Sequence, residues 1–237
     1  MVNKLINLGN TCAINSLLQC INICKINISI FDKPENNTFT RALFELLHLM
    51  QVYDNKIIKP NNFLNYLYST FSSFQPRQQL DAQEIWTLLS NEVFNNTGNA
   101  IDNNKSFTSI IHKKAYEQIV KHNNNKTSLW NDIFQGVLLQ ILICCNCKNK
   151  TYSFETFYSI SLNLGDSIIS MLKEYFSKNI TDEIDCECCR KKSKQEKYIK
   201  FYKLPKYLVI SLNRYNNLGQ KLNFKVNINK NILLSNN

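Results

Sequence analysis

The first half of the chain repeats apolar residues at the spacing of amphipathic helices. Between residues 11 and 26 the apolar positions recur every three or four residues, and this spacing places Cys12 at the beginning of a helix. The same spacing predicts four further helices, over residues 40–53, 61–71, 82–94 and 110–120. The rest of the segment 95–131 is rich in asparagine, and we expect little regular structure there.

From Phe134 onward the period of the apolar residues shortens towards that of β-strands. Strands are predicted where β-branched and aromatic residues gather between turn residues, over residues 137–144, 152–164, 197–203 and 207–213. Helices first and strands later predict an α+β fold rather than an alternating α/β fold. Apart from two pairs of cysteines, we find no internal repeat in the sequence.

The composition is that of a globular chain with a sizeable core. Hydrophobic residues make up 44% of the 237 residues, and five Gly and four Pro exclude collagen-like and low-complexity chains. No signal peptide is recognisable in the first ten residues, and the most apolar stretch, Val137–Cys145, is far too short to cross a bilayer. We therefore expect a cytoplasmic or nuclear protein, neither secreted nor membrane-embedded, whose nine cysteines are thiols or metal ligands.

The net charge of +10 is unevenly distributed along the chain. Residues 190–206 hold eight Lys or Arg against Glu196 alone, so this run carries +7 of the +10. Such a run is either a solvated face or a surface for nucleic acid or another acidic partner. Apart from Tyr198, Phe201 and Tyr202 it lacks the interleaved aromatic residues of a base-stacking platform, which disfavours nucleic acid.

Two cysteine triplets have a spacing typical of a metal site. Residues 144–147 (Cys-Cys-Asn-Cys) and 186–189 (Cys-Glu-Cys-Cys) each contain a C-x2-C pair. Two such pairs on two turns supply four thiolates to a tetrahedral zinc, which would hold a lobe together without taking part in catalysis. Because Cys145 and Cys188 are surplus, the spacing leaves the choice of ligands within each triplet open. The alternative is a chance cluster of buried or free cysteines.

Cys12 stands apart from these triplets and follows the polar turn Gly9-Asn10-Thr11. At the start of a helix, unpaired N–H groups and the helix dipole favour a thiolate, which is a nucleophile. Asn7, five residues earlier in the same turn, has an amide that can donate to a developing oxyanion. A cysteine at a helix start is, by itself, more often just a small buried residue.

Four segments follow one another in a definite order: Leu5–Gln19, Gln79–Ile85, Phe134–Leu162 with its first cysteine pair, and Cys186–Tyr215 with the second. They resemble the cysteine box, the glutamine/aspartate box, the first zinc knuckle with its following strand, and the second knuckle with the Leu-Pro strand of the ubiquitin-specific proteases. These enzymes, also called ubiquitin carboxyl-terminal hydrolases, are papain-like cysteine peptidases that cleave after the C-terminal glycine of ubiquitin.

The resemblance implies a hand-shaped, papain-like fold. Residues 1–133 would form a helical thumb that carries the cysteine and glutamine/aspartate boxes. Residues 134–204 would form zinc-bearing β fingers, and residues 205–237 the start of a palm sheet that is incomplete. The partners would be ubiquitin and ubiquitinated proteins.

The resemblance also implies roles for individual residues. Cys12 would be the nucleophile and Asn7 the oxyanion-hole amide. Asp81, Gln83 and Glu84 would face the channel for the tail of ubiquitin, where an acid can pair with arginines of the tail. The alternative for these three is an ordinary polar helix start that stabilises the dipole. The ligands of one structural zinc would be Cys144, Cys147, Cys186 and Cys189.

The sequence departs from the family pattern in three places. Ala13 stands where the family usually has an aromatic residue, and Leu80 where it often has glutamine. The family's general base is a histidine in a Gly-His-Tyr run after the Leu-Pro strand, and no such run occurs up to Asn237. The histidines present are expected to be a half-buried structural residue, an exposed helix residue and a loop residue, namely His48, His112 and His122.

Three functional hypotheses follow from the sequence. The first is a deubiquitinase, a thiol-dependent hydrolase that acts through Cys12. The second is a catalytically incomplete pseudoprotease or truncated gene product that binds ubiquitin, because a cysteine without a base lacks the proton relay of the reaction. The third and most distant is a zinc-knuckle protein that binds nucleic acid through residues 190–206, which would leave the ordered boxes unexplained.

Overall fold

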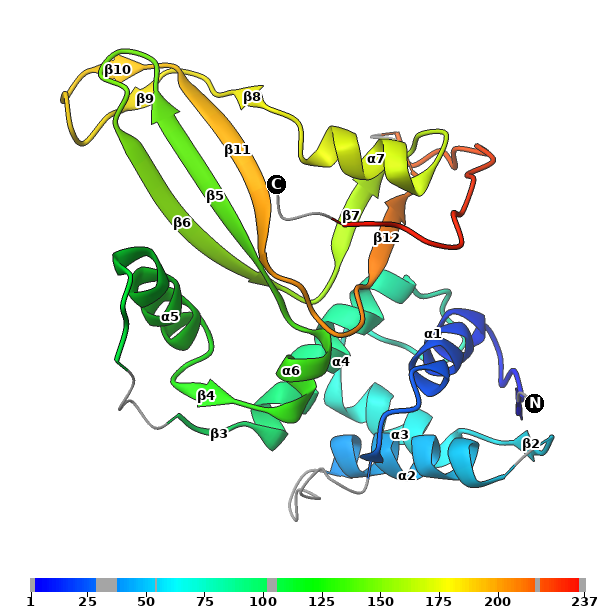
Figure 1. The fold of residues 1–237 in the computed structure, drawn as a ribbon. Helices are drawn as coiled ribbons and strands as arrows, with labels where there is room; N and C mark the ends of the chain where they lie inside the picture. Colours follow the sequence, from blue (N-terminus) through cyan, green and yellow to red (C-terminus); the bar gives the residue numbers. More distant parts are fainter. Residues whose placement is uncertain (1–2, 29–37, 54, 102–105, 216–217, 235–237) are drawn as a thin grey trace. The chain divides into compact units, whose positions relative to one another are not determined.

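The structure is a computed structural model, and it describes residues 3–28, 38–53, 55–101, 106–215 and 218–234. The chain divides into two units, Met1–Asn99 with Ser128–Trp130 and Ala100–Thr127 with Asn131–Asn237. The predicted α+β class is confirmed, because the first unit is helical and the second is built mainly of strands (Figure 1). Among the described residues, no helix is both long and apolar enough to cross a membrane.

The described part of the first unit contains the helices α1 (Cys12–Ile23), α2 (Thr38–Val52), α3 (Asn61–Thr70) and α4 (Ala82–Thr97). Each agrees with a predicted helix to within a few residues, because the apolar stripe that predicts it is the face that it buries. Two short strands, β1 (Lys4–Leu5) and β2 (Ile57–Ile58), pair in parallel beside these helices.

Aromatic rings fill much of the core of the first unit. The Phe39 ring lies 5.6 Å from that of Phe63, and Trp86 lies 6.0 Å from Trp130. All four side chains are almost fully buried. Burial of rings of this size is a main source of the unit's stability, since each ring removes a large apolar area from water.

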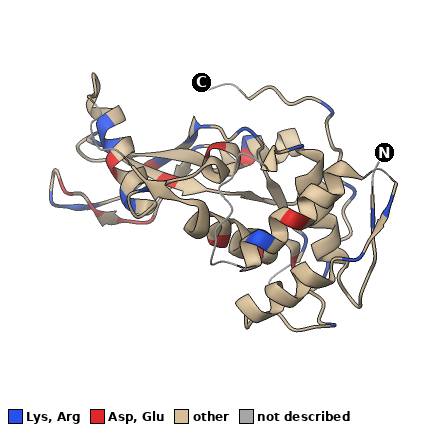
Figure 2. Cartoon of the chain, turned by 90° about the horizontal axis from the view of Figure 1, so that it is seen from below, with Lys and Arg blue, Asp and Glu red and all other residues tan. Residues whose placement is uncertain are grey.

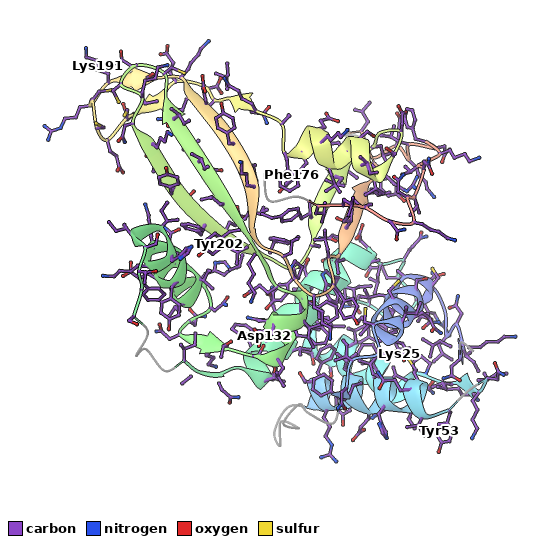
Figure 3. All side chains as sticks on the ribbon, in the orientation of Figure 1. Lys25, Tyr53, Asp132, Phe176, Lys191 and Tyr202 are labelled. Carbon is purple, nitrogen blue, oxygen red and sulfur yellow. The ribbon has the colours of Figure 1, made fainter. Side chains whose placement is uncertain are left out.

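The second unit is organised around a sheet with the strand order β6-β5-β11-β8. Its strands are β5 (Gly136–Cys144), β6 (Lys150–Phe157), β8 (Asn179–Ile180) and β11 (Gln195–Lys203), and neighbouring strands are antiparallel. Helix α5 (Ile110–His122) packs on one face of this sheet beside Tyr202, whose ring lies 4.9 Å from Phe154 (Figure 3).

Shorter elements complete the chain. They are β3 (Asn99–Ala100), β4 (Lys126–Thr127), α6 (Leu129–Phe134), β7 (Ile160–Asn163), α7 (Ile168–Tyr175), β9 (Ile184–Asp185), β10 (Lys192–Ser193) and β12 (Ile210–Asn213). Strands β9 and β10 pair in antiparallel fashion at the far end of the long strands (Figure 1). Helix α7 covers the apolar side of β7 and β12 and buries Ile168, Met171 and Leu172 there.

Strands β7 and β12 have the same sequence, Ile-Ser-Leu-Asn, and pair in parallel with identical residues opposite each other. Ile160 and Leu162 point into the core, while the hydroxyls of Ser161 and Ser211 lie 2.8 Å apart on the exposed side. The expectation of no repeat beyond the cysteine pairs is therefore wrong. A four-residue repeat is short enough to be overlooked in the sequence. Its structural role, the pairing of two identical strands, is evident only in the folded chain.

Three other expectations are also wrong. The segment 152–164 is not one strand but two, β6 and β7, which belong to different sheets. The strand expected at 207–213 is limited to β12, and helices α6 and α7 were not predicted. The predicted helix 110–120 is confirmed as α5, but the rest of the segment 95–131 is more regular than expected, because α4 extends to Thr97, β3 and β4 lie within the segment and α6 begins at Leu129.

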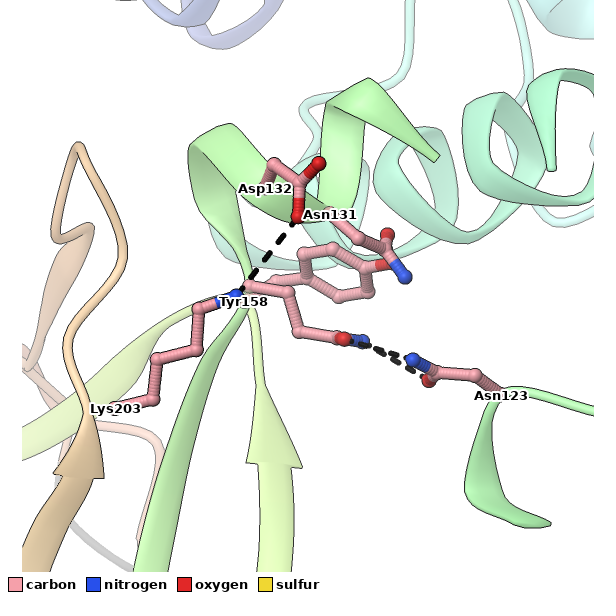
Figure 4. Close-up of polar contacts among 6 residues, drawn as sticks. Asn123, Asn131, Asp132, Tyr158 and Lys203 are labelled. Atoms are coloured by element: carbon pink, nitrogen blue, oxygen red, sulfur yellow. Dashed lines mark hydrogen bonds and ion pairs between the residues drawn. The ribbon is translucent and has the colours of Figure 1, made fainter. Parts of the chain in front are cut away.

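Buried polar contacts lie next to the point where the chain leaves the long sheet after β6 (Figure 4). Immediately after β6, the Tyr158 hydroxyl donates a hydrogen bond to Asn131 Oδ1 at 2.5 Å. Close by, the side-chain amides of Asn123 and Gln135 exchange two hydrogen bonds of 2.9 and 3.1 Å. Because all these amides are buried, each bond satisfies groups that would otherwise be costly to remove from water.

Candidate active site and metal centre

Cys12 is the first residue of α1, as the sequence predicts, and its side chain is exposed. The turn before it contains two successive residues with positive φ, Gly9 at 102° and Asn10 at 54°. Only glycine and, less readily, asparagine adopt this conformation at low cost, so these two residue types allow the sharp approach to the helix. No side chain caps the first turn of α1. Cys12 is thus placed on the surface at the positive end of a helix dipole.

Asn7 is fixed by the same turn. Its Oδ1 accepts hydrogen bonds from the backbone N–H of Gly9 at 3.1 Å, the N–H of Thr11 at 3.1 Å and the Thr11 hydroxyl at 3.2 Å. The Thr11 oxygen in turn accepts from the N–H of Leu8 at 3.1 Å, and Thr11 is almost fully buried. Since the oxygen of the Asn7 amide is held by three donors, its Nδ2 is the end left to donate to another molecule.

Further hydrogen bonds hold the segment that leads to this turn. The side chain of Asn15 donates to the carbonyl of Ile6 at 3.1 Å, and that of Gln19 donates to the carbonyl of Asn3 at 2.6 Å. Thr11, Asn15 and Gln19 recur at intervals of four residues and therefore form one polar stripe along α1. This spacing was present in the sequence, but it was not recognised as a signal for a supporting role.

Asp81, Gln83 and Glu84 lie together at the start of α4, in the same unit as Cys12. Asp81 is the N-cap residue, and its Oδ1 accepts from the N–H groups of Gln83 at 2.6 Å and Glu84 at 3.3 Å. The carboxylate thus satisfies backbone donors that have no partner within the helix. Asp81 and Glu84 remain exposed, whereas Gln83 is partly buried.

The three histidines differ from expectation in two cases. His48 is exposed rather than half-buried, because α2 buries the side that carries Leu43, Leu47 and Met50 and turns His48 outward. His122 is the last residue of α5 rather than a loop residue, and His112 is exposed on that helix, as predicted. Of the three, His48 lies in the same unit as Cys12, and no hydrogen bond joins these two residues in the described part of that unit.

Four cysteine sulfur atoms lie together in the second unit. Those of Cys144, Cys147, Cys186 and Cys189 are all within 4.8 Å of one another, and this group contains neither Cys145 nor Cys188. Four sulfur atoms at this spacing match the donor set and the compactness of a tetrahedral metal site. Cys145 is partly buried and Cys188 exposed, each directed elsewhere by its position within the turn.

The two turns that carry these cysteines have the same construction. After each pair the next residue has positive φ, Lys148 at 61° and Arg190 at 54°. The N–H of Lys148 donates to the carbonyl of Cys144 at 2.9 Å, and that of Arg190 donates to the carbonyl of Cys186 at 2.8 Å. The C-x2-C spacing therefore produces two matching turns whose thiols converge from opposite sides.

Hydrogen bonds to sulfur shift the acidity of these thiols. The backbone N–H of Cys147 is the main group that lowers the pKa of Cys144, to about 6. The N–H of Lys191 is likewise the main cause of a lowered pKa at Cys189. The N–H of Asn149 acts in the same direction on Cys147, but burial and the neighbouring thiols outweigh it and raise the pKa of Cys147 to about 12. Four sulfurs this close cannot all be anionic unless a cation joins them.

The basic run 190–206 is not an unopposed positive surface. Lys192 lies opposite Asp185 in the register of β9 and β10, and Lys203 Nζ lies 3.8 Å from Asp132 Oδ1. Lys191 stands at the tip of the unit (Figure 3), and Figure 2 shows acidic as well as basic residues on the strands of this unit. This mixture is typical of a solvated face, the first of the two interpretations of the run.

Comparisons with known proteins agree with these observations. The family model described as ubiquitin carboxyl-terminal hydrolase matches residues 3–237. Ubiquitin carboxyl-terminal hydrolase 12 of Salmo salar is 27% identical over 242 residues, covering 94% of this chain and 64% of the relative. Ubiquitin carboxyl-terminal hydrolase 2 of Bos taurus is 25% identical over 235 residues, covering 88% of this chain and 39% of the relative.

The fold is also similar to that of a solved structure. A chain in the SAGA Ubp8/Sgf11/Sus1/Sgf73 DUB module bound to ubiquitin aldehyde matches with a TM-score of 0.66 and 20% identity. The match covers 97% of this chain and 51% of that one. This chain therefore spans less than two thirds of the length of the relatives named here.

Proposed function

Because this chain belongs to the ubiquitin carboxyl-terminal hydrolase family, we propose that it is a deubiquitinase that cleaves the bond after the C-terminal glycine of ubiquitin. The observation that carries the proposal is the turn from Asn7 to Cys12, which combines an exposed thiol at a helix start with an amide whose oxygen is already bonded. A nucleophile and an oriented hydrogen-bond donor are the two groups that acyl transfer requires first.

In this mechanism the sulfur of Cys12 attacks the carbonyl carbon of the terminal glycine. The carbonyl oxygen becomes an oxyanion, and Asn7 Nδ2 donates a hydrogen bond to it. Collapse of the tetrahedral species expels the amine and leaves a thioester on Cys12, which water then hydrolyses to restore the thiol. The departing amine takes up a proton from a general acid, for which an imidazole is the usual group at neutral pH.

We assign the approach of the ubiquitin tail to the start of α4. One oxygen of Asp81 caps the helix, and the second can accept from an arginine of the tail. Gln83 and Glu84, on the first turn of the same helix, add polar groups to this channel. In the same proposal residues 1–133 act as thumb, 134–204 as fingers and 205–237 as part of the palm, with ubiquitinated proteins as substrates.

The cysteine group is proposed to hold one structural zinc ion through Cys144, Cys147, Cys186 and Cys189. The ion would keep all four sulfurs as thiolates and fix the two turns to each other. With four protein ligands it leaves no open position for water or substrate, so it takes no part in the cleavage. Nine cysteines that form no disulfide among the described residues suit a reducing compartment, and we place the protein in the cytoplasm or nucleus.

The proposed activity is tested with ubiquitin that carries a C-terminal fluorophore. The purified chain, supplied with zinc and a reductant, is compared with Cys12→Ala and with Cys20→Ala, which removes another exposed thiol from the same helix. Release by the wild type and by Cys20→Ala, but not by Cys12→Ala, is the expected result. Asn7→Ala should lower kcat about 100-fold or more with little change in KM, because the donor acts on the transition state.

The opposite result is equally informative. If the folded wild type releases no more fluorophore than Cys12→Ala, the chain as given is not a hydrolase. A titration of labelled ubiquitin then separates a protein that binds ubiquitin without cleaving it from one that does not bind it at all.

A further inference from the structure

Asn146, which is not a member of the sulfur group, contacts sulfur atoms of both cysteine turns. Within its own turn, its backbone N–H bonds to the sulfur of Cys144. Its side-chain Nδ2 reaches across to the other turn and lies 3.6 Å from Cys189 Sγ, a donor–sulfur distance appropriate for an N–H···S hydrogen bond. The two residues are 43 positions apart in the sequence, so this contact links the turns independently of any metal.

The matching position of the second turn carries no such group. The two turns align Cys144 with Cys186 and Cys147 with Cys189, so Asn146 aligns with Cys188, which is exposed and outside the sulfur group. Asn146 therefore has no counterpart at the same position of the second turn, although the side chain of Ser193, four residues after Cys189, also bonds to the sulfur of Cys144. Asn146 is itself exposed, so its contact with Cys189 lies on the solvent side of the site.

We propose that Asn146 is a positioning residue of the zinc site, which holds Cys189 in place and slows loss of the metal. The inference rests on the zinc site proposed above. An amide that donates to a thiolate disperses part of its charge and fixes its direction, and it also blocks the approach of water or a chelator from the exposed side. Partners of metal ligands commonly change metal affinity by about 10–100-fold when they are removed.

Zinc itself is the probe for this proposal. The affinity and the rate of zinc loss to a chromophoric chelator are measured for the full chain, for Asn146→Ala and for Asn149→Ala. Asn149 lies in the same turn but contributes backbone groups, its carbonyl accepting from the N–H of Cys144 at 3.0 Å and its N–H bonding to Cys147, so it is a matched control. Asn146→Ala should bind zinc about tenfold more weakly and lose it faster, whereas Asn149→Ala should resemble the wild type.

Two further measurements separate positioning from simple loss of structure. Cobalt in place of zinc should give the same tetrahedral four-thiolate spectrum in Asn146→Ala as in the wild type, only at a higher metal concentration. Asn146→Asp keeps the size of the side chain but replaces the donor by a negative charge, and it should bind zinc most weakly of all. The circular dichroism of the metal-free chains should be the same for all variants.

The outcomes distinguish this inference from the zinc proposal. If the wild type binds one zinc and Asn146→Ala binds it equally well, the positioning role is refuted while the zinc site stands. If the two asparagine variants lose affinity equally, the effect belongs to the turn and not to Asn146, and the inference fails. If the wild type binds no zinc, both proposals are overturned.

Discussion

Replacing Gly136 by alanine should destabilise the base of the long sheet. Gly136 begins β5 and lies directly opposite Phe157 of β6 in the antiparallel register. The Phe157 ring packs across the glycine, so that an added Cβ would lie 2.5 Å from ring atom Cε1 and 2.9 Å from Cε2, and closer still to Cζ. Carbon atoms do not approach this closely without a shift of one partner, so the ring must move.

The size of the effect depends on the packing contacts that the Phe157 ring would lose on moving. Phe157 packs against the buried cluster beneath α7, and its ring lies 6.1 Å from that of Phe201. Forcing one extra carbon into such a contact costs about 1–3 kcal/mol. Alanine also restricts the unfolded chain more than glycine does, and this raises the free energy of unfolding by about 0.4–1 kcal/mol. A net loss of about 1–2 kcal/mol remains.

Amide hydrogen exchange is the suitable assay, because it reads each unit separately. Backbone amides of β5 and β6 in Gly136→Ala should exchange about 5–30-fold faster than in the wild type, the factor that corresponds to this loss. Amides of α2 and α4 in the first unit serve as an internal control. Both tryptophans of the chain, Trp86 and Trp130, also lie in the first unit, so their fluorescence reports on it independently.

A double-mutant cycle identifies the cause of the effect. Leucine at position 157 is shorter than the ring and leaves room for the new methyl group. In a Phe157→Leu background, Gly136→Ala should therefore be nearly neutral, and the coupling between the two sites should be about 1–2 kcal/mol. If Gly136→Ala accelerates exchange to the same extent in both backgrounds, the contact with the ring is not the reason for the glycine.

Three other outcomes are expected. Thr11→Val should lower kcat for ubiquitin hydrolysis about tenfold without changing KM, whereas Thr11→Ser, which keeps the hydroxyl, should leave kcat unchanged. If Thr11→Val lowers kcat by the same factor in an Asn7→Ala background, Thr11 does not act through Asn7. Asp81→Asn should keep the N-cap and the stability of α4 but weaken the salt-dependent binding of ubiquitin. Asp81→Ala should weaken binding and also lower the free energy of unfolding by about 0.5–2 kcal/mol. Unchanged ubiquitin affinity in Asp81→Asn would exclude a role for the charge. Burial is the main cause that raises the pKa of Tyr158 well above its usual value, so the folded state holds this proton more tightly than the unfolded state. The free energy of unfolding should therefore keep the full contribution of Tyr158 below about pH 10 and decrease above it. Urea titrations from neutral to alkaline pH should show a shallower decline for Tyr158→Phe, and parallel curves for the two proteins would contradict this assignment.

The helices of the first unit were predictable because their signal is local. In α1 and α2 the apolar residues that define the stripe are those that the helix buries, so sequence spacing and burial carry the same information. The error at His48 shows the limit of this argument. Its neighbours Leu47 and Leu49 suggest an apolar surrounding, but Leu49 is itself 42% exposed, so the buried stripe is narrower than the apolar segment.

The elements that were missed depend on partners far away in the sequence. Helix α7 has only eight residues, and its signals, a Ser167 capping box followed by Ile168, Met171 and Leu172, become convincing only when β7 and β12 provide the surface that it covers. The end of β6 coincides with the hydrogen bond between Tyr158 and Asn131, a long-range contact that no periodicity reveals.

The candidate sites show the same division. The spacing of the cysteines was enough to predict a metal site. Which four sulfur atoms lie together is evident only from the two folded turns. The sequence placed Asn7 and Cys12 in one turn. It did not reveal that the Thr11 hydroxyl would bond to Asn7 rather than cap the helix, because threonine at a helix start commonly does the latter.

The identical strands β7 and β12 raise a question of selectivity between molecules. Because both read Ile-Ser-Leu-Asn, a strand from a second copy of the chain would match either one as well as its own neighbour does. The internal pair is favoured by its tether, since a segment about fifty residues along the same chain meets its partner at an effective concentration of roughly millimolar. Protein at micromolar concentration competes at a disadvantage of about a thousandfold. Strand exchange is therefore prevented by the connecting chain and not by the side chains, and cleavage of that connection would remove the protection while leaving both strands intact.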